Sequence, residues 1–466
     1  MAAAKRMLWG WCFCVVLQGG FSAESQDLPS LLWMAPVLNP GGFSSEALCY
    51  ADALQQAYRA SGDVGRFGVR QFAEHMRADF IQGLPNRLGT QISEMMQNGK
   101  RQPWDVVVCH STPDVWHEDG AFGWGRMEPC PPAGTKLSIG RSMYETDRVP
   151  EDWVPRLNRM DQVWVPSQFG LEQFVSSGVK REKIAVVPEA VDTDHFNPSV
   201  EPLDLGPGLQ GQYLFLSVFK WEKRKGWDIL LRAYFEEFTG ADNVLLIIKT
   251  QPFHSGGGFH SQVLQEIAQA QEAGADAKNP ARYQLLSQNL ALKDLPRLYR
   301  AADAFVLPSR GEGWGQPYVE AMSMALPVIG TNWSGCTEFL HSDVALPLPL
   351  DGLEPAENGI GQWAQPSRAQ LRRLMRYLQQ HPQEGKAIGK AARQRMVERF
   401  RPEKVVSQHI LPLLQRWHRG LEEDLTPNLR HPPQDRSAFL GRPTGPTGKR
   451  FHHQQSQGVR DALKWD

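Results

Sequence analysis

The sequence predicts an α/β protein of two domains, each with a parallel sheet that helices cover on both faces. Short apolar runs typical of buried strands alternate with segments whose apolar residues recur at helical spacing. A stretch rich in Pro and Gly at residues 197–212, NPSVEPLDLGPGLQGQ, divides this alternation into two halves of similar size. The length of 466 residues also suits two or three domains. One large continuous sheet is the alternative, and the linker argues against it.

The first half, residues 24–196, carries strand-like runs and helical segments in alternation. Strands are expected at 30–38 (SLLWMAPVL), 105–111 (DVVVCHS), 162–167 (QVWVPS) and 183–192 (KIAVVPEAVD). SSEALCYADALQQAYRA and QFGLEQFVSSG, which follow the first and third runs, have apolar residues at helical spacing.

The second half, residues 213–420, repeats this organisation. Strands are expected at 213–219 (YLFLSVF), 244–250 (VLLIIKT), 304–309 (AFVLPS) and 326–330 (LPVIG), with a helix at 226–238. Two such halves usually bind a ligand in the crevice at the carboxyl ends of their strands.

The two ends of the chain differ from this body. Lys5 and Arg6 precede the apolar run MLWGWCFCVVLQGG, so residues 1–23 are expected to be a secretory signal peptide. A buried strand or a signal anchor is the alternative. The signal predicts a protein of the secretory pathway, in the endoplasmic reticulum lumen or secreted. Residues 421–466, rich in Pro, Gly, Gln and basic residues, are expected to form a disordered basic tail.

Charge and cysteine content exclude some classes of function. The formal net charge of −1 provides no bulk field that favours nucleic acid. The four cysteines that follow the predicted signal form no CxxC pair, which argues against a zinc site. One or two disulfides, or four buried thiols, both fit the sequence. These cysteines are Cys49, Cys109, Cys130 and Cys336.

The stretch PSRGEGWGQPYVEAMSMALPVIG, residues 308–330, places two glutamates, Glu312 and Glu320, on either side of a glycine-rich turn that opens a helix. Glycines permit a tight turn and the close approach of a ligand. The free N–H groups of the helix, which is expected to start at Pro317, favour an anion. Paired carboxylates also suit general acid/base work. The helix terminus and the nearby lysines instead favour a sugar nucleotide, whose hydroxyls carboxylates can bind.

EGWGQPYVE resembles the E-x7-E motif of the retaining GT-B glycosyltransferases, a large GT4-like family also described as glycosyl transferases group 1. FKWEKRKGWDILLRAY is similar to the R-x5-K-G segment of that family, and VVPEAVDTDHFNP to its inter-domain strand and loop. The resemblance covers residues 183–345 and weakens back to about residue 30. It implies two Rossmann-like domains that face a cleft. It also implies retaining transfer of a hexose-type sugar from a nucleotide-sugar donor to a glycan, lipid or protein acceptor, without a metal or other cofactor.

The resemblance assigns roles at the donor site residue by residue. Glu320 is expected to bind the ribose hydroxyls, Glu312 to lie by the transferred sugar, and Lys225 to neutralise the diphosphate. The arginine of the R-x5-K-G segment falls on Phe219, which is a departure from the family pattern. Lys220, one residue on, is the candidate substitute.

Further positions are expected at the cleft, His110 from its place at the end of a strand and the others by the same resemblance. His110, at the end of a predicted strand, is a candidate for contact with the transferred sugar or the acceptor, and a structural histidine is the alternative. Arg141 and Glu145 are expected to line the cleft. The remaining candidates are glycines and loop residues expected to bind the donor. They are Gly41, Gly42, Gly313, Trp314, Gly315 and Gln316.

Other interpretations of the sequence follow from its departures and its short motifs. Because Phe219 stands where the family has arginine, one alternative is a protein that binds sugar nucleotides without turnover. A GT-B epimerase acting on a UDP-sugar is a further alternative. Asp192-Thr193-Asp194 spells D-x-D, the metal–diphosphate signature of a different transferase fold. Because it follows the inter-domain strand, we expect a loop cap there instead.

Overall fold

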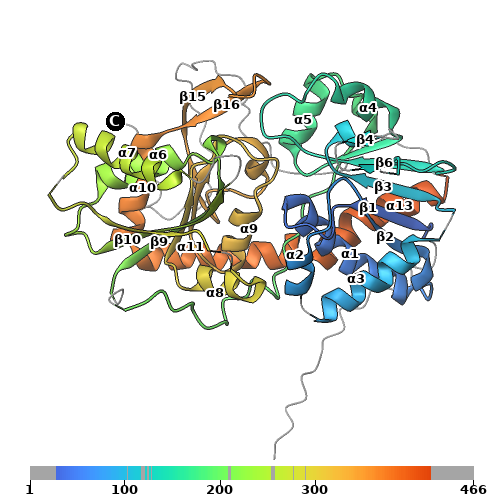
Figure 1. The fold of residues 1–466 in the computed structure, drawn as a ribbon, viewed down its shortest axis with the longest axis horizontal. Coiled ribbons are helices and arrows are strands. Elements are labelled where there is room, and N and C mark those ends of the chain that lie inside the picture. Colours follow the sequence, from blue (N-terminus) through green and yellow to red (C-terminus); the bar gives the residue numbers. More distant parts are fainter. Residues whose placement is uncertain are drawn as a thin grey trace, which may run out of the picture.

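The computed structural model describes residues 28–420 except 85, 102, 117–120, 123–124, 127, 208–210, 253–257, 277 and 289. The predicted signal peptide and C-terminal tail lie outside these residues. The chain forms two α/β halves side by side, as the sequence predicts (Figure 1). Across the described ranges, no helix combines the length and apolar character needed to cross a membrane.

The N-terminal half is built on a six-stranded parallel sheet in the order β2-β1-β3-β6-β7-β8. Two of its strands, β2 and β6, are missed by sequence analysis, because FGVRQ and LSIGR mix polar residues and glycine into their apolar runs. The strands are β1 (Leu31–Ala35), β2 (Phe67–Gln71), β3 (Val106–His110), β6 (Leu137–Arg141), β7 (Gln162–Val165) and β8 (Ile184–Val186).

Helices cover both faces of this sheet, because side chains of β1 alternate between two hydrophobic cores. Leu31 and Trp33 pack in the core that includes α1, whereas Leu32 and Met34 pack in the core that includes α4 and α5. A short hairpin, β4 (Ala121–Phe122) and β5 (Gly125–Arg126), lies apart from the sheet. The helices are α1 (Gly42–Ala60), α2 (Ala78–Gly83), α3 (Asn86–Gly99), α4 (Trp153–Arg159) and α5 (Gln168–Ser176).

The C-terminal half repeats the arrangement with six parallel strands in the order β11-β10-β9-β12-β13-β14. Its strands are β9 (Tyr213–Trp221), β10 (Val244–Pro252), β11 (Arg282–Leu286), β12 (Ala304–Leu307), β13 (Val328–Thr331) and β14 (Leu346–Leu348). Its helices are α6 (Trp227–Glu237), α7 (Phe259–Glu272), α8 (Leu295–Arg300), α9 (Gln316–Ser323), α10 (Arg368–Gln380) and α11 (Pro382–Arg395).

An antiparallel hairpin, β15 (Leu350–Pro355) and β16 (Gln362–Pro366), stands at the top of the C-terminal half in Figure 1. It contacts the N-terminal half. The backbone N–H of Gln362 donates to Asp147 Oδ1 at 2.7 Å, and Asn358 donates to the Tyr144 hydroxyl at 2.9 Å. The hairpin therefore joins the two halves on one side of the molecule.

The chain returns to the N-terminal half after α11, as the orange-to-red helices of Figure 1 show. Two π-helical turns (Met396–Phe400 and Val406–Ile410) interrupt the path to α12 (Pro402–Val405) and α13 (Leu411–His418). Apolar residues of this last stretch complete the core around α1 and β1, although they follow the C-terminal half in sequence. They are Val405, Val406, Ile410, Leu411 and Leu414. The boundaries 24–196 and 213–420 stay a prediction.

One disulfide settles part of the cysteine question. Cys109, at the end of β3, is bonded to Cys130, and Cys49 and Cys336 are free thiols. The bridge closes a loop with a sequence separation of 21 residues, which restricts the unfolded chain.

Replacing Cys130 with alanine is expected to lower the free energy of unfolding by about 3 kcal/mol, the loop-entropy value for a bridge of this span. Urea denaturation at equilibrium measures the change. Repeating the denaturation in the presence of a reductant provides a matched control. The reductant should lower the urea midpoint of the wild type and leave the urea midpoint of Cys130→Ala unchanged. Equal midpoints for the oxidised and reduced wild type would show that the bridge contributes nothing.

Candidate functional site

The glycine-rich turn predicted between the two glutamates runs from the end of β12 to α9. Gly315, with φ of 110°, lies in the left-handed region before the helix begins. A Cβ on Gly311 would lie 1.9 Å from the Glu145 carbonyl oxygen, and one on Gly313 would lie 2.5 Å from the Met143 side chain. These two glycines therefore admit a segment of the N-terminal half directly onto the turn.

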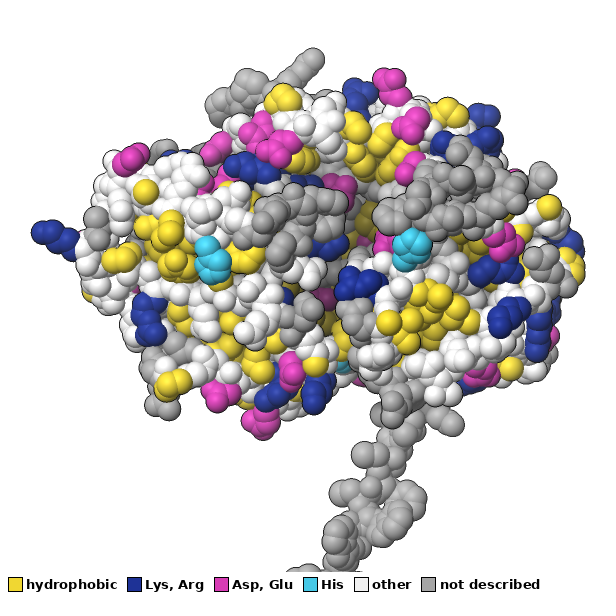
Figure 2. All heavy atoms as spheres, in the orientation of Figure 1, with side chains coloured by type: hydrophobic (Ala, Val, Ile, Leu, Met, Phe, Trp, Pro, Cys, Tyr) yellow, Lys and Arg dark blue, Asp and Glu magenta, His cyan; other side chains and the backbone are white. Residues whose placement is uncertain are grey.

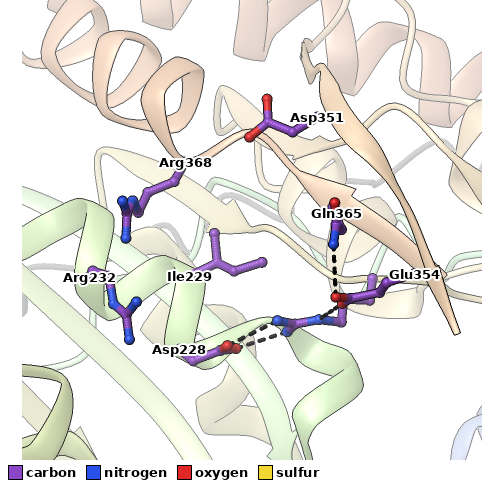
Figure 3. A pocket seen from close by; sticks show the side chains of 8 residues that line it. Asp228, Ile229, Arg232, Asp351, Glu354, Gln365 and Arg368 are labelled. Carbon is purple, nitrogen blue, oxygen red and sulfur yellow. Dashed lines mark hydrogen bonds and ion pairs between the residues drawn. The ribbon is translucent and has the colours of Figure 1, made fainter. Parts of the chain in front are cut away.

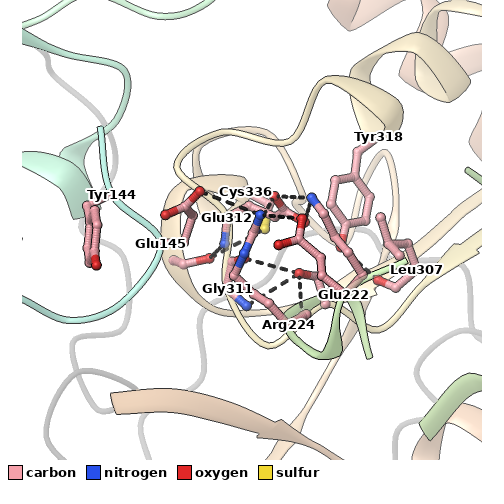
Figure 4. A network of polar contacts seen from close by, with 12 residues as sticks. Tyr144, Glu145, Glu222, Arg224, Leu307, Gly311, Glu312, Tyr318 and Cys336 are labelled. Atoms are coloured by element: carbon pink, nitrogen blue, oxygen red, sulfur yellow. Dashed lines mark hydrogen bonds and ion pairs between the residues drawn. The ribbon is translucent and has the colours of Figure 1, made fainter. Parts of the chain in front are cut away.

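Glu312 lies in this turn, and two cations from the segment after β9 hold its carboxylate (Figure 4). Its carboxylate oxygens lie 2.7 and 2.8 Å from Lys225 Nζ, and Oε2 lies 2.9 Å from an Arg224 nitrogen. Only 7% of the Glu312 side chain is exposed. Burial raises the pKa of this carboxyl, but the charges of Lys225 and Arg224 outweigh it and lower the pKa to about 2. Glu312 is consequently anionic throughout the physiological range and unsuited to donate a proton.

Lys225 reaches Glu312 because the segment after β9 turns sharply. Lys223–Lys225 form one 3₁₀ turn, and Gly226 adopts φ of 67° before α6 begins. A Cβ on Gly226 would lie 1.9 Å from the Pro308 carbonyl oxygen, so glycine is required at this approach of two strand ends. The K-G pair and the first motif glutamate, predicted separately, therefore belong to one site.

Glu320 lies within α9, partly buried, with a single hydrogen bond from the Tyr299 hydroxyl at 2.7 Å. Burial raises the pKa of its carboxyl to about 7, and the bond from Tyr299 offsets only part of that rise. No cation comparable to Lys225 contributes to its pKa shift. Ionising Glu320 in the folded protein thus costs stability, which is typical of a binding group.

Replacing Glu320 with glutamine is expected to stabilise the protein at pH 8 by about 1–3 kcal/mol. The pKa of about 7 in the folded state exceeds the ordinary 4.5, so the wild type loses stability as pH rises between these values. The gain should vanish near pH 4.5. Thermal denaturation across this range measures the difference, and the exposed Glu357, replaced by glutamine, is the matched control. A variant that is no more stable at pH 8 would contradict this assignment.

Phe219 and Lys220 occupy different environments at the end of β9. Phe219 is 5% exposed, and its ring lies 5.8 Å from that of Trp221 in the core. An arginine at position 219 would place a guanidinium in this buried position beside the Trp221 ring, which is costly for a charged group. Lys220 is partly buried, and burial lowers its pKa, with Lys225 and Arg224 among the charges that act on it. Its role as a candidate for the diphosphate stays a prediction.

Sequence analysis does not identify Arg224 and Arg310 as residues of the site. Arg310 precedes the glycine turn, and its guanidinium binds Asp228 with two nitrogens at 2.8 and 2.9 Å and Glu354 of β15 at 2.7 Å. It thereby ties the turn to α6 and to the hairpin. In the sequence, Arg310 is only an arginine between a predicted strand and a glycine. Its partners Asp228 and Glu354 lie 82 and 44 residues away along the chain.

A pocket of about 300 Å³ opens beside Arg310, on the side of α6 and the hairpin (Figure 3). Its charges are balanced, with three arginines and three carboxylates, and most are paired. The pocket is bounded by α6, α10 and the hairpin, and no residue of the N-terminal half lines it. The lining residues are Asp228, Ile229, Arg232, Arg310, Asp351, Glu354, Gln365 and Arg368.

His110 lies at the carboxyl end of β3 in a fully buried polar network. The Trp33 indole N–H donates to Nδ1 at 3.0 Å, so in the neutral ring Nε2 carries the proton and donates to Glu46 at 3.0 Å. Arg141 also binds Glu46, at 2.7 Å. Burial raises the pKa of Glu46, but Arg141 and His110 lower it to about 2. Both ring nitrogens of His110 are thus engaged inside the N-terminal half, and its role at a substrate stays a prediction.

The remaining candidates divide by exposure. The Trp314 ring is buried against Phe339 and Phe400, so any donor contact at this position would come from its backbone. Gln316 donates to the buried Glu189 of the N-terminal half at 2.8 Å.

The glycine loop of the N-terminal half is open. Gly41 and Gly42 begin α1, and a Cβ on either would meet nothing within 4 Å. The fold therefore does not require glycine there, and this end of α1 has room for a ligand to approach.

The D-x-D motif lies in a loop between the two halves. Asp192 Oδ1 accepts hydrogen bonds from the backbone N–H groups of Asp194 and His195, so this D-x-D is a loop cap as expected.

The two residues expected to line the cleft differ in exposure. Glu145 lies 3.5 Å from Arg224 and so meets the site from the N-terminal half, whereas Arg141 is fully buried. Figure 2 shows charged side chains of both signs in the furrow between the halves.

Comparison with known proteins identifies the class. Residues 210–349 match the family model described as glycosyl transferases group 1. The alpha-galactosylglucosyldiacylglycerol synthase of Streptococcus pneumoniae is 26% identical over 181 residues, 37% of this chain and 44% of that protein. The mannosylfructose-phosphate synthase of Agrobacterium fabrum is 27% identical over 167 residues, 34% of each chain. The chain thus spans less than half the length of these curated relatives.

Solved structures share the fold over most of the chain. Anabaena HepE, crystallised with UDP and glucose, has a TM-score of 0.58 at 17% identity, covering 83% of this chain and 99% of that one. Sucrose-phosphate synthase of Thermosynechococcus elongatus has a TM-score of 0.56 at 15% identity, covering 84% and 99%. The chain therefore has the GT-B fold, and its residues 210–349 are similar to the glycosyl transferases group 1.

The expected location in the secretory pathway is wrong. The curated relatives that the chain matches are bacterial proteins, and bacteria have no endoplasmic reticulum. Nothing in these matches points to an endoplasmic reticulum lumen or to secretion. The apolar run at residues 7–20, on which the expectation depended, lies outside the described residues.

Proposed function

We propose that the protein is a retaining glycosyltransferase, which moves a hexose-type sugar from a nucleotide-sugar donor to an acceptor. One observation carries the proposal: Lys225 and Glu312 meet, 2.7 Å apart, at the glycine turn that opens α9, and Glu320 lies on that same helix. This supports a site with a cation for the phosphates, an anion for the sugar hydroxyls and a second anion for the ribose hydroxyls of a sugar nucleotide.

The diphosphate has two sources of positive potential. The N-terminus of α9 carries the positive end of the helix dipole, although Pro317 has no N–H and the Tyr318 N–H donates to the Gly315 carbonyl at 3.0 Å. Lys225 supplies an ammonium at the turn that precedes this helix. The open start of α1 at Gly41 and Gly42 offers further N–H groups from the opposite half. A carboxylate accepts hydrogen bonds only, so Glu320 suits ribose hydroxyls and Glu312 suits the hydroxyls of the sugar.

The mechanism that fits these residues relies on the substrate for proton transfer. In retention, the acceptor hydroxyl approaches the face that the diphosphate leaves. The bond from the anomeric carbon to the phosphate oxygen breaks, the bond to the acceptor oxygen forms, and the acceptor proton passes to the departing phosphate. Lys225 and the α9 amides stabilise the charge that grows on that phosphate, so the proposal requires no metal or other cofactor. Glu312, whose pKa is about 2, binds hydroxyls rather than exchanging protons.

A donor screen tests the proposal. The protein is incubated with UDP-glucose, UDP-GlcNAc and GDP-mannose, binding is measured by calorimetry, and products are followed by NMR. We expect one donor to bind and to give a product, on a suitable acceptor, with the anomeric configuration of the donor. A donor that changes its sugar without transfer would indicate an epimerase. Binding without turnover would indicate a non-catalytic protein, the alternative that Phe219 suggests. An absence of binding would overturn the proposal.

A further inference from the structure

Lys225 cannot serve Glu312 and a diphosphate equally. Its ammonium has three N–H donors, and in the structure its nitrogen lies within 2.8 Å of both oxygens of Glu312. A diphosphate carries more negative charge than a carboxylate, so a bound donor competes with Glu312 for Lys225. Glu312 would then be left as a buried carboxylate without this partner, which is a costly state unless another cation remains.

Arg224 is the cation that remains. Its guanidinium donates to the Gly311 carbonyl at 2.6 Å and to Glu312 Oε2 at 2.9 Å, and it reaches Glu222 at 3.2 Å and Glu145 at 3.5 Å. The rigid, planar fork of an arginine is fixed by these four contacts from two directions. Unlike the flexible ammonium of Lys225, this guanidinium is not free to turn toward a ligand.

We propose that Arg224 is a positioning residue, which holds Glu312 anionic and in place when a donor diphosphate draws Lys225 away. Of the two cations, Arg224 contacts Oε2 only, whereas Lys225 contacts both oxygens, and the Ser309 side chain also hydrogen-bonds to this carboxyl. Departure of Lys225 therefore leaves Oε1 without a cation, and this oxygen is the one that turns to a hydroxyl of the transferred sugar. The inference deepens the proposed function and rests on it for the identity of the ligand.

The first test separates the sugar from the diphosphate. Arg224→Met is titrated with UDP and UDP-glucose, or with GDP and GDP-mannose, whichever pair the wild type binds. We expect the affinity for the nucleoside diphosphate to stay within about threefold, because Lys225 is still present. The affinity for the sugar nucleotide should fall about tenfold or more, the value of one charge-assisted hydrogen bond. Arg224→Lys, which keeps a cation without the fork, should lie between.

Arg232→Met is the matched control, since Arg232 binds Glu266 in the same half and outside the turn. It should change neither affinity. Equal weakening of both ligands by Arg224→Met would overturn the inference, because it would assign Arg224 to the diphosphate or to the fold. A wild type that binds neither pair would overturn the proposed function instead.

The second test needs no donor. Lys225→Met imitates the state in which Lys225 has turned away, and Arg224 should still hold Glu312 anionic. The double variant Lys225→Met/Arg224→Met leaves Glu312 buried without either cation, so its carboxyl should take up a proton. Its melting temperature should then fall more steeply than that of the wild type as pH rises from 5 to 8, because Glu320 already gives the wild type a fall of its own. Adding Glu312→Gln should return the slope to that of the wild type. The inference fails if Lys225→Met alone steepens the fall as much as the double variant does.

Discussion

Replacing Lys225 with alanine is expected to slow sugar transfer on the order of 10²-fold, as removal of one oxyanion donor does. Charge builds on the diphosphate as the glycosidic bond breaks, so Lys225 interacts more strongly with the transition state than with the bound donor. Its side chain is only 11% exposed, and the weak screening around it enlarges the effect. Steady-state kinetics with the best donor of the screen should show a loss in kcat that exceeds any change in KM.

The neighbouring lysines provide the controls. Lys223 lies 2.6 Å from Asp228 and is 38% exposed, so Lys223→Ala should leave turnover within about twofold. Lys220→Ala should lose less than Lys225→Ala if it only stands in for the arginine that Phe219 replaces. Wild-type turnover in Lys225→Ala would mean that KRKG is a turn, and the phosphate site would have to be sought at the start of α9 alone.

Replacing Arg141 with methionine is expected to lower the free energy of unfolding by about 3–5 kcal/mol. Arg141 and Glu46 are both fully buried, 2.5 Å apart at their closest, so the substitution leaves a carboxylate without a cation inside the core. Methionine fills much of the same volume, which limits the contribution of a cavity. Urea denaturation at pH 7 measures the loss.

An exposed pair in the same half provides the comparison. Arg59 and Glu94 are 2.6 Å apart but 45% and 41% exposed, so Arg59→Met should cost about 1 kcal/mol or less. Adding Glu46→Leu to Arg141→Met should recover part of the stability, because no unpaired charge is then buried. A loss below 1 kcal/mol for Arg141→Met would contradict the view that this pair is structural.

The sequence predicts the strands that lie in mainly apolar runs of about four residues or more, and misses the three-residue strand β14. The strands β1, β3, β7, β9 and β12 follow from such runs, because a strand buried on both faces needs apolar side chains on both. The strand β11, RYQLL, and the hairpin β15–β16, LDGLEP and QWAQP, are missed because their faces are only partly covered and their residues are mixed. Periodicity within a segment carries no information about which other segment will cover it.

The site shows the same limit. Glu312, Glu320 and Lys225 could be named because they belong to motifs that read along the chain. The partners of Arg224 are 87 and 88 residues away along the chain, and Arg141 and Glu46 are 95 apart. Arg224 looks like an ordinary surface charge in the sequence, and Arg141 is named there only through the family resemblance. The fold alone determines which carboxylates these two arginines meet.

The return of the chain to its first half has a consequence for synthesis on the ribosome. Strands of the N-terminal half emerge first, and domains commonly fold in that order. Here the core around α1 also contains Val405, Ile410 and Leu414, which are translated more than 200 residues after β8. The half that leaves the ribosome first is therefore the last to complete its core, and an apolar groove stays exposed on the nascent chain until α13 has been made.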